Sequence, residues 1–292
     1  DKTAHLWSAA DGRILATLEG HTDAVSNASF SPDGKTVVTA SHDQTARLWS
    51  AADGHHLATL EGHTAEVSNA SFSPDGKTVV TASHDQTARL WSAADGHHLA
   101  TLEGLSADFP FASFSPDGKT LATASVDEAA MLWNVADRRL LYPLKGLTGE
   151  FSFASFSPDG KTVVAASLDH TARLWNVADG RPLASLEGHN GALVHAAFSP
   201  DGKTVVTASV DNTARLWNAA DGRPLAKLVG HWKGVMYAAF DPDGKTLVTA
   251  SMDRTARLWR CHVCQPTDKL ADLLEARLDG PTVASQKLPS SK

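Results

Sequence analysis

Short stretches of alternating apolar and polar residues recur along this chain, with turn residues about every ten positions. Between residues 21 and 62 the stretches are 25–31, 36–41, 45–50 and 56–60. Alternation with a period of two is typical of β-strands. The turn Ser31-Pro32-Asp33-Gly34 has Pro second and Gly fourth, which suits a type I turn followed by a left-handed residue. The pattern predicts a four-stranded antiparallel meander. It excludes a parallel βαβ array, because the unit has no room for a crossover helix.

The frame D-Q-T-A-R-L-W at residues 43–49 returns at a constant interval of 42 residues. It places seven of the eight tryptophans on one register, at Trp7, Trp49, Trp91, Trp133, Trp175, Trp217 and Trp259. A fixed period of roughly 20–50 residues indicates a repeat architecture. A single meander cannot bury both faces, whereas several stacked around an axis can, and only short edges then remain. We therefore predict an all-β propeller with six first, six second, seven third and six fourth strands.

Three motifs carry a resemblance to a known family. They are the S-P-D-G turn, the D-x-T-A-R-L-W strand and the Gly-His pairs at 20–21, 62–63, 188–189 and 230–231. Together they resemble WD40 repeats over about residues 1–260. The chain departs from the family where Ser50, Asn134 or Arg260 follows the tryptophan in place of Asp. The resemblance implies a propeller of four-stranded antiparallel blades that acts as a non-catalytic interaction scaffold or sensor.

The strand count leaves two ways to build the propeller. In a closed six-bladed ring, residues 14–18 complete the last blade and one third strand is displaced. In a truncated seven-bladed array, one inner pair of strands is absent and would lie upstream in a parent protein. We favour the truncated array. The domain boundaries that we expect are a propeller at 1–260, a cap at 261–280 and a disordered tail at 281–292. Within the cap, leucines at helical spacing predict a short amphipathic helix over Thr267–Asp279.

Ser, His and Asp recur together with the tryptophan, a combination that could form a catalytic triad. The resemblance instead implies structural tetrads that hold each blade together, and four copies of one catalytic site in a ring are implausible. The tetrads that we expect are His21, Ser41, Asp43 and Trp49; His63, Ser83, Asp85 and Trp91; His189, Ser209, Asp211 and Trp217; and His231, Ser251, Asp253 and Trp259.

Two repeats have leucine at the histidine position, Leu105 and Leu147. A buried polar group that loses its partner costs on the order of 1–3 kcal/mol. We therefore expect these two repeats to be less stable than the others. Drift is one explanation for the loss, because neighbouring repeats share stability. A specialised surface is the other.

Variation between the repeats gathers on the rim formed by the loop before each blade and the turn before the tetrad Asp. The later repeats carry aromatic and apolar residues there, which is how interaction hot spots look. The candidate partner-binding residues are Phe109, Phe111, Val126, Phe151, Phe153, Leu168, Trp232, Tyr237 and Met252. The alternative is that the four phenylalanines fill the space left by the missing histidines.

Composition narrows the remaining classes of function. A net charge of −7 without basic clusters does not favour binding to nucleic acid or to an anionic membrane. The histidine pairs 55–56 and 97–98 and the lone Cys261-x-x-Cys264 do not make a metal site, since structural zinc needs four ligands. We expect no cofactor, no metal and no enzymatic activity, a protein or peptide partner, and a cytoplasmic location in a larger bacterial signalling protein. The rival expectations are a propeller enzyme with its site in the central channel, or a purely structural segment.

Overall fold

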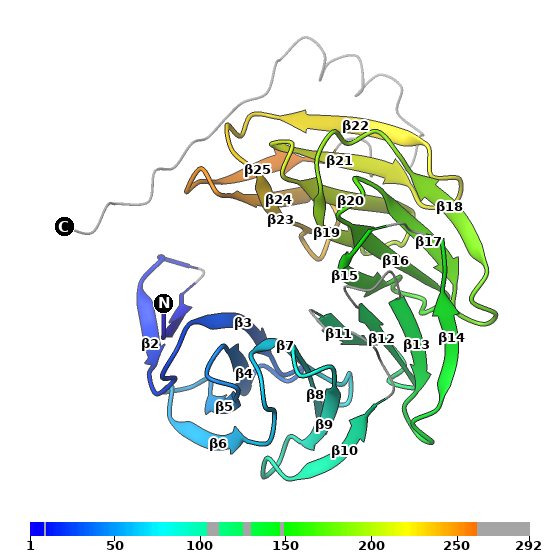
Figure 1. Ribbon diagram of the computed structural model, residues 1–292. Coiled ribbons are helices and arrows are strands. Elements are labelled where there is room, and N and C mark those ends of the chain that lie inside the picture. Colours follow the sequence, from blue (N-terminus) through cyan, green and yellow to red (C-terminus); the bar gives the residue numbers. More distant parts are fainter. Residues whose placement is uncertain (9, 104–110, 125–129, 147–148, 262–292) are drawn as a thin grey trace. The chain divides into compact units, whose positions relative to one another are not determined.

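The alternating stretches form strands in the computed structural model, which describes residues 1–8, 10–103, 111–124, 130–146 and 149–261 (Figure 1). The first complete repeat pairs β3 (Val25–Phe30), β4 (Thr36–Ser41), β5 (Ala46–Ser50) and β6 (His56–Leu60) in chain order. The second and fourth strands have the predicted bounds. The first ends one residue earlier, because Ser31 belongs to the turn and its N–H bonds to the Thr36 carbonyl at 2.8 Å.

The other described strands repeat this order. They are β1 (Ala4–Trp7), β2 (Ile14–Leu18), β7 (Val67–Phe72), β8 (Thr78–Ser83), β9 (Ala88–Ser92), β10 (His98–Leu102), β11 (Phe111–Phe114), β12 (Thr120–Ala124), β13 (Ala130–Asn134), β14 (Leu140–Leu144), β15 (Phe151–Phe156), β16 (Thr162–Ser167), β17 (Ala172–Asn176), β18 (Pro182–Leu186), β19 (Leu193–Phe198), β20 (Thr204–Ser209), β21 (Thr213–Asn218), β22 (Pro224–Val229), β23 (Val235–Phe240), β24 (Thr246–Ser251) and β25 (Ala256–Arg260). The described residues thus contain the predicted numbers of first, second, third and fourth strands, and no helix that could cross a membrane.

The chain divides into two units, each described here by itself. The first contains the sheets from β1 to β14, and the second contains the sheets β19–β22 and β23–β25 together with β16 to β18. Strand β15 begins in the first unit and ends in the second.

Neighbouring sheets of the first unit pack face to face. Val38, Ala40 and Leu48 of one sheet pack against Val79 and Trp91 of the next, and all of these side chains are buried. This explains why strand β4 is buried at every position after Thr36, on both faces, although a lone meander would have one wet face. The core of the fold therefore lies between sheets.

Proline and glycine hold the S-P-D-G turns of successive sheets against each other. Gly34 and Gly76 both have φ of +70°, a left-handed conformation that glycine adopts without strain. A Cβ on Gly76 would lie 3.6 Å from Cδ of Pro32 in the preceding sheet, and one on Gly118 would lie 3.6 Å from Cδ of Pro74. The turn motif thus both ends a hairpin and packs on its neighbour.

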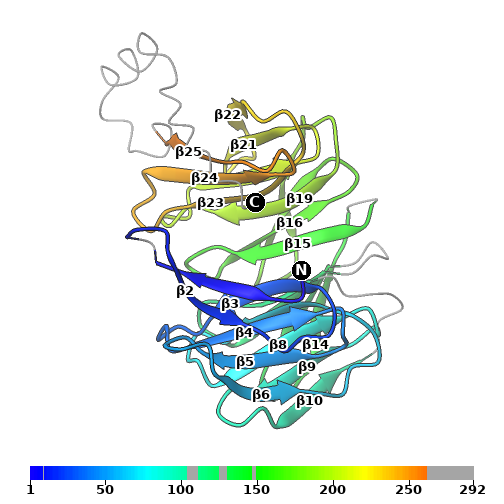
Figure 2. The ribbon, with the colours of Figure 1, turned by 90° about the vertical axis from the view of Figure 1, so that its left-hand side faces the viewer.

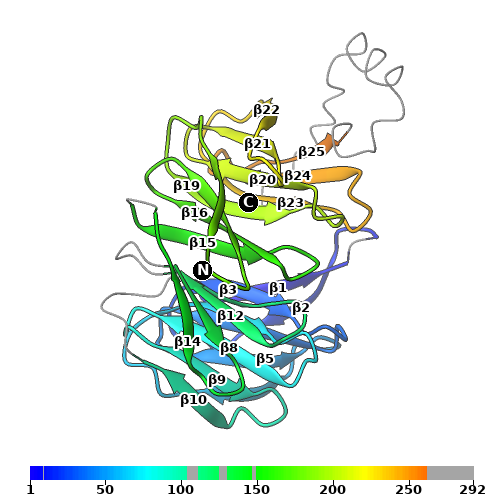
Figure 3. The same ribbon diagram turned by 90° about the vertical axis from the view of Figure 1, so that its right-hand side faces the viewer.

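In the second unit the same packing extends to Cys261. Val206 and Leu216 pack against Val235, Leu247 and Cys261. Figure 3 shows strands β20, β21, β23 and β24, to which the first four of these residues belong. The Cys261 N–H bonds to the Lys245 carbonyl at 2.8 Å, and the residue is buried and disulfide-bonded. Cys261 therefore belongs to the last sheet in its packing. The expected helix over 267–279, the tail and Cys264 lie outside the described residues.

The amino-terminal strands form a sheet of their own. β1 pairs with β2 in antiparallel register, from Ala4↔Leu18 to Trp7↔Ile14, and Figure 2 shows this pair beside β3. Residues 14–18 thus pair with the amino-terminal third strand, which is not displaced. This pairing is the one that the truncated array requires, and the sheets are the blades of a partial propeller.

Candidate functional site: polar clasps and an apolar rim

A hydrogen-bonded clasp lies at the start of each repeat that has a Gly-His pair. In the first complete repeat, His21 Nδ1 lies 2.8 Å from Asp43 Oδ2 and His21 Nε2 lies 2.7 Å from Thr39 Oγ1. The same Thr39 oxygen accepts the Trp49 Nε1–H at 2.8 Å. The loop before the sheet is thereby joined to the second and third strands.

All the hydrogen bonds of this clasp run in the same direction from donor to acceptor. Burial lowers the pKa of His21 below 6.5 and outweighs the opposing effect of Asp43, so the imidazole is neutral. Burial alone would raise the pKa of Asp43, but hydrogen bonds from Thr45, the Thr22 N–H and His21 hold it at about 2. The neutral ring donates Nδ1–H to the carboxylate and accepts the Thr39 hydroxyl at Nε2. The hydrogen bonds thus run from the Trp49 N–H through Thr39 and His21 to the Asp43 carboxylate.

The structure corrects one member of each expected tetrad. The hydrogen bonds of Ser41 go elsewhere than to His21: its oxygen accepts the Asp43 N–H at 3.1 Å and its hydroxyl donates to the Asp23 carbonyl at 3.2 Å. Side chains two residues apart on a strand share a face, so Thr39 and Ser41 both point toward the loop. Only Thr39 lies at the level of the histidine and tryptophan. Ser41 instead stabilises the turn that presents Asp43.

The clasp recurs with nearly constant geometry. In the other three copies, the His–Asp and His–Thr distances are 2.7–2.8 Å and the tryptophan donates to the threonine at 2.8 Å. The members are His63, Thr81, Asp85 and Trp91; His189, Thr207, Asp211 and Trp217; and His231, Thr249, Asp253 and Trp259. Ser83, Ser209 and Ser251 have the turn role of Ser41.

Glycine precedes the clasp histidine because an arginine takes the space of a side chain. A Cβ on Gly20 would lie 2.6 Å from Nη1 of Arg47 and 3.3 Å from the Trp49 ring. Gly20 also has φ of +152°, in the region that favours glycine. The Gly-His pair and the A-R-L-W strand are therefore two halves of one packing unit.

The fourth repeat lacks the centre of the clasp as well as its histidine. Its second strand has Ala165 at the position of Thr39, and Ala165 is fully buried. The third repeat keeps Thr123, which accepts the Trp133 Nε1–H at 3.0 Å. The sequence already contains this difference. T-V-V-A-A-S replaces T-V-V-T-A-S in the repeat in which Leu147 replaces the histidine. Leu105, Leu147, Ser125 and Asp127 lie outside the described residues.

The rim residues expected to bind a partner differ widely in exposure. Trp232, Met252, Tyr237 and Leu168 are exposed by 65%, 59%, 48% and 39%. Phe109 and Val126 lie outside the described residues. Phe151 is only 1% exposed, so the expectation that it binds a partner was wrong. It fills the core position that Val67 and Val235 occupy in other repeats, because the larger ring points between the sheets.

Phe111 and Phe153 belong to a row of contacts that joins successive first strands. Their rings stack with centroids 4.1 Å apart, and both side chains are partly buried. At the same position in earlier repeats, Asn69 Oδ1 accepts the Ala112 N–H at 3.3 Å. His195 and Tyr237 stack in the second unit with centroids 4.2 Å apart. These side chains therefore link one sheet to the next.

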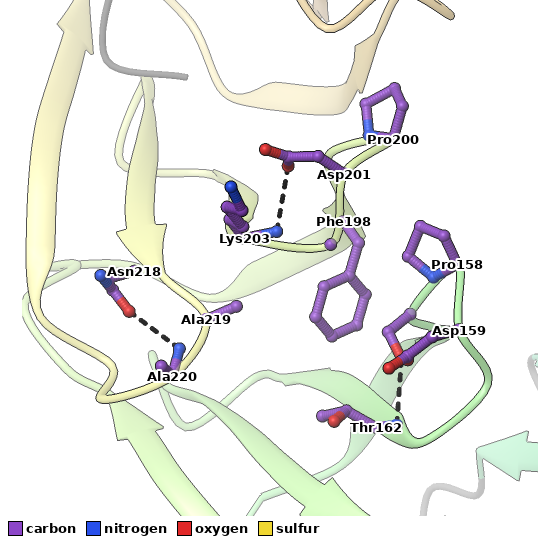
Figure 4. Close-up of a pocket in the computed structure, with 12 residues that line it drawn as sticks. Pro158, Asp159, Thr162, Phe198, Pro200, Asp201, Lys203, Asn218, Ala219 and Ala220 are labelled. Carbon is purple, nitrogen blue, oxygen red and sulfur yellow. Dashed lines mark hydrogen bonds between the residues drawn. The ribbon is translucent and has the colours of Figure 1, made fainter. Parts of the chain in front are cut away.

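A hollow of about 730 Å³ in the second unit is formed by turns (Figure 4). Its acidic residues already accept hydrogen bonds, with Asp201 Oδ1 3.0 Å from the Lys203 nitrogen and 2.6 Å from the Ser199 hydroxyl. A smaller hollow with the same lining pattern lies between Ser31 and Phe72 in the first unit. The hollow is a consequence of stacking repeats. Among the described residues, no group of three His, Cys, Asp or Glu is placed to hold a metal ion.

Comparison with known proteins assigns the family. The model described as WD domain, G-beta repeat matches residues 12–50, 54–92, 96–134, 140–176, 180–218 and 222–260. These segments cover more than half of the 292 residues, and the chain belongs to the WD40 repeat family. A search of curated proteins found no match. WD40 repeats generally mediate protein–protein interaction, and their domains are typically non-catalytic scaffolds.

Proposed function

We propose that this chain is a non-catalytic interaction module that binds a protein or peptide through an apolar rim on its second unit. The apolar rim is defined here as Leu168, Val210, Trp232 and Met252. Large apolar side chains gathered on an otherwise polar surface are typical of binding sites. The exposure of Trp232, at 65%, is the observation that carries the proposal most directly.

The backbone beneath the apolar rim is held firmly. The Trp232 N–H donates to the Asp253 carboxylate of the clasp at 3.2 Å, and the Met252 N–H donates to the Gly234 carbonyl at 2.9 Å. A Cβ on Gly234 would lie 3.2 Å from Cα of Val210 and 3.7 Å from Sδ of Met252, so these residues lie side by side. A partner would thus meet a preorganised surface, which lowers the ordering cost of binding.

The equivalent surface of the first repeats is polar. Five repeats earlier, Trp232 corresponds to Thr22 and Met252 corresponds to His42. His42 Nδ1 lies 3.5 Å from Oε2 of Glu66, and both side chains are about half exposed. Repeats of one backbone geometry thus carry two surface chemistries, and only the apolar one suits a buried contact with a partner.

The same proposal places the chain in the cytoplasm, as the sensor or scaffold part of a larger signalling protein. The low cysteine content, two residues in 292, supports this placement. The rival function, catalysis, gains no support from a metal site, because no group of three His, Cys, Asp or Glu among the described residues is placed to hold a metal ion.

The test uses peptide ligands selected against the full chain from a display library. Trp232→Thr combined with Met252→His gives the rim the residues of the first complete repeat. We expect this variant to bind the selected peptide at least about 30-fold more weakly, as loss of a hot spot does, with an unchanged melting temperature.

The matched control is Thr22→Ala with His42→Ala, at the same positions of the first complete repeat. It should leave binding unchanged. Equal affinity of the rim variant and the parent chain, or an equal loss in the control, would overturn the proposal.

A further inference from the structure

Two exposed cations stand beside the apolar rim. Lys233 follows Trp232 in the loop before β23, and Arg254 follows Met252 by two residues in the turn between β24 and β25. Because β23 and β24 are antiparallel, this loop and this turn lie at the same end of the sheet. The Ser251 hydroxyl joins them by donating to the Lys233 carbonyl at 2.9 Å. Both charges therefore adjoin the residues on which the proposed function rests.

The exposure of these positions belongs to the repeat. Val210 and Leu168 are the equivalents of Met252, and they are 43% and 39% exposed although a further sheet packs on the sheet of each. Asn190 is likewise exposed at the position of Trp232. The surface position of Trp232 and Met252 thus follows from the backbone that all these repeats share.

Neither cation has an acidic partner in the part of the chain that the structure describes. The salt bridges among the described residues include neither Lys233 nor Arg254. The Lys233 ammonium lies over the Trp232 ring, 5.0 Å from its centroid. The carboxylate of Asp253 is buried and already accepts hydrogen bonds from His231 and from the Trp232 N–H. Both cations therefore remain available to the carboxylates of a partner.

The cations at the other end of these sheets differ in this respect. Lys245 Nζ lies 3.3 Å from Asp243 Oδ2, and Arg181 Nε lies 4.0 Å from Asp179 Oδ2. These turns join a first strand to a second or a third strand to a fourth, so they lie away from the apolar rim. Each of their cations stands two residues after an aspartate, which compensates its charge locally.

The first complete repeat has the opposite charge at the same positions. Five repeats earlier, Lys233 corresponds to Asp23 and Arg254 corresponds to Gln44. The next repeat adds Glu66 to this polar surface. The buried clasp carboxylate is common to these repeats and cancels in the comparison. The change from a polar to an apolar rim is thus accompanied by a change from exposed acids to exposed bases.

We propose that the partner of the apolar rim is an acidic peptide segment, in which Asp or Glu residues flank one large apolar residue. This inference rests on the proposed function and adds the chemistry of the ligand to it. The apolar residue packs on Trp232 and Met252, and the carboxylates pair with Lys233 and Arg254. Complementary charge around an apolar contact speeds association and disfavours partners of the wrong charge.

The attraction is local. The net charge of the whole chain is −7, which would by itself repel an acidic peptide. Salt screens exposed charges beyond about 8 Å at physiological ionic strength, so the two cations beside the bound peptide outweigh the distant acids.

The first experiment sequences the peptides selected against the full chain from a random display library. Those that depend on the apolar rim should be enriched in Asp and Glu beside an aromatic or large aliphatic residue, relative to the unselected library. In a synthetic copy of one such peptide, replacing Asp and Glu by Asn and Gln should weaken binding about tenfold. Raising NaCl from about 50 to about 500 mM should weaken the acidic peptide to a similar degree and leave the amide version nearly unchanged.

The second experiment changes the chain. Lys233→Asp with Arg254→Gln gives the rim the charges of the first complete repeat, and should weaken the acidic peptide at least about tenfold, mainly through slower association. The matched control is Lys203→Asp with Lys245→Gln, which makes the same change in net charge at the other end of the sheets. It should bind within about twofold of the parent chain, because salt screens the distant charges. Melting temperatures of both variants check that the fold is retained.

Rim-dependent peptides without enrichment of acidic residues would overturn the proposal. So would equal affinity of the parent chain and the Lys233→Asp, Arg254→Gln variant for an acidic peptide, or an equal loss in the control. The proposed function fails by a different result, namely that changes at 232 and 252 weaken no selected peptide. The two failures are therefore distinguishable.

Discussion

The first complete repeat and the fourth repeat have the same apolar core but differ in the polar clasp. Val37, Val38 and Trp49 are at most 2% exposed, and Val163, Val164 and Trp175 at the same positions are fully buried. The first complete repeat has His21 and Thr39, whereas the fourth has Leu147 and Ala165. The sheet therefore forms and packs without the clasp. What the clasp adds is a fixed position for the loop before the sheet.

The largest effect that we expect comes from breaking the clasp at its centre. Thr39→Val keeps the shape of the side chain but leaves His21 Nε2 and Trp49 Nε1 buried without their partner. Two such groups should lower the free energy of unfolding by about 2–4 kcal/mol. Thr123→Val in the third repeat removes the acceptor of Trp133 and should cost about half as much. Urea unfolding of both variants measures the difference; equal losses would contradict the role of Thr39 as a shared centre.

A gain should follow from installing the clasp where it is absent. Leu147→His with Ala165→Thr gives the fourth repeat the histidine and threonine of the first complete repeat. We expect the free energy of unfolding to rise by roughly 1 kcal/mol, the net value of new hydrogen bonds. The single variant Ala165→Thr is the control and should not reproduce the gain. If the double variant is no more stable than the control, the two repeats differ by more than the clasp.

Acid should weaken the clasped repeats in two stages. The clasp histidines His21, His63 and His189 have pKa values lowered mainly by burial, so the unfolded chain binds more protons than the folded one. Stability is then full above pH 6.5 and falls as the pH drops below it. Asp43 and Asp211 have pKa values of about 2, held down by hydrogen bonds against the effect of burial, so a second loss begins below pH 3.8.

The measurement is the urea midpoint at pH 7.5 and at pH 5 for the parent chain and for His21→Leu, which resembles the fourth repeat. The variant should lose less stability between the two pH values, because one buried neutral histidine is gone. His195, whose pKa burial lowers to about 3, contributes equally to both chains and cancels. Identical pH dependence of the parent chain and the variant would show that burial in the clasp does not lower the pKa of His21.

The smallest stability effect that we expect comes from the surface. Trp232→Thr alone should change the free energy of unfolding by less than about 0.5 kcal/mol, because an exposed side chain away from the core contributes little. The melting temperature of this variant measures whether Trp232 contributes to the stability of the fold. A large loss would mean that Trp232 holds the last sheet together and is not available to a partner.

The sequence predicted some members of the clasp correctly and others wrongly, and the outcome depended on which groups each side chain contacts. The resemblance to WD40 repeats implied that His21, Asp43 and Trp49 belong to one cluster, and hydrogen bonds through Thr39 join them. Ser41 was placed in the cluster in error, because two hydroxyl residues on one strand face look alike in a pattern. Phe151 was expected on the surface for a similar reason, since the pattern of a strand does not say how deeply its first residue is inserted.

The sequence by itself determined the repeat, its strand order, its turns and the kinds of residue on each strand face. These follow from local alternation and from the conformational demands of proline and glycine, which act within a few residues. Only the tertiary structure decided which hydroxyl completes the clasp and which phenylalanines are buried. Those outcomes depend on contacts between strands some 10 to 40 residues apart, such as Trp49 with Thr39 and Ser26 with Val67. Packing between sheets sets these contacts, and no local pattern specifies them.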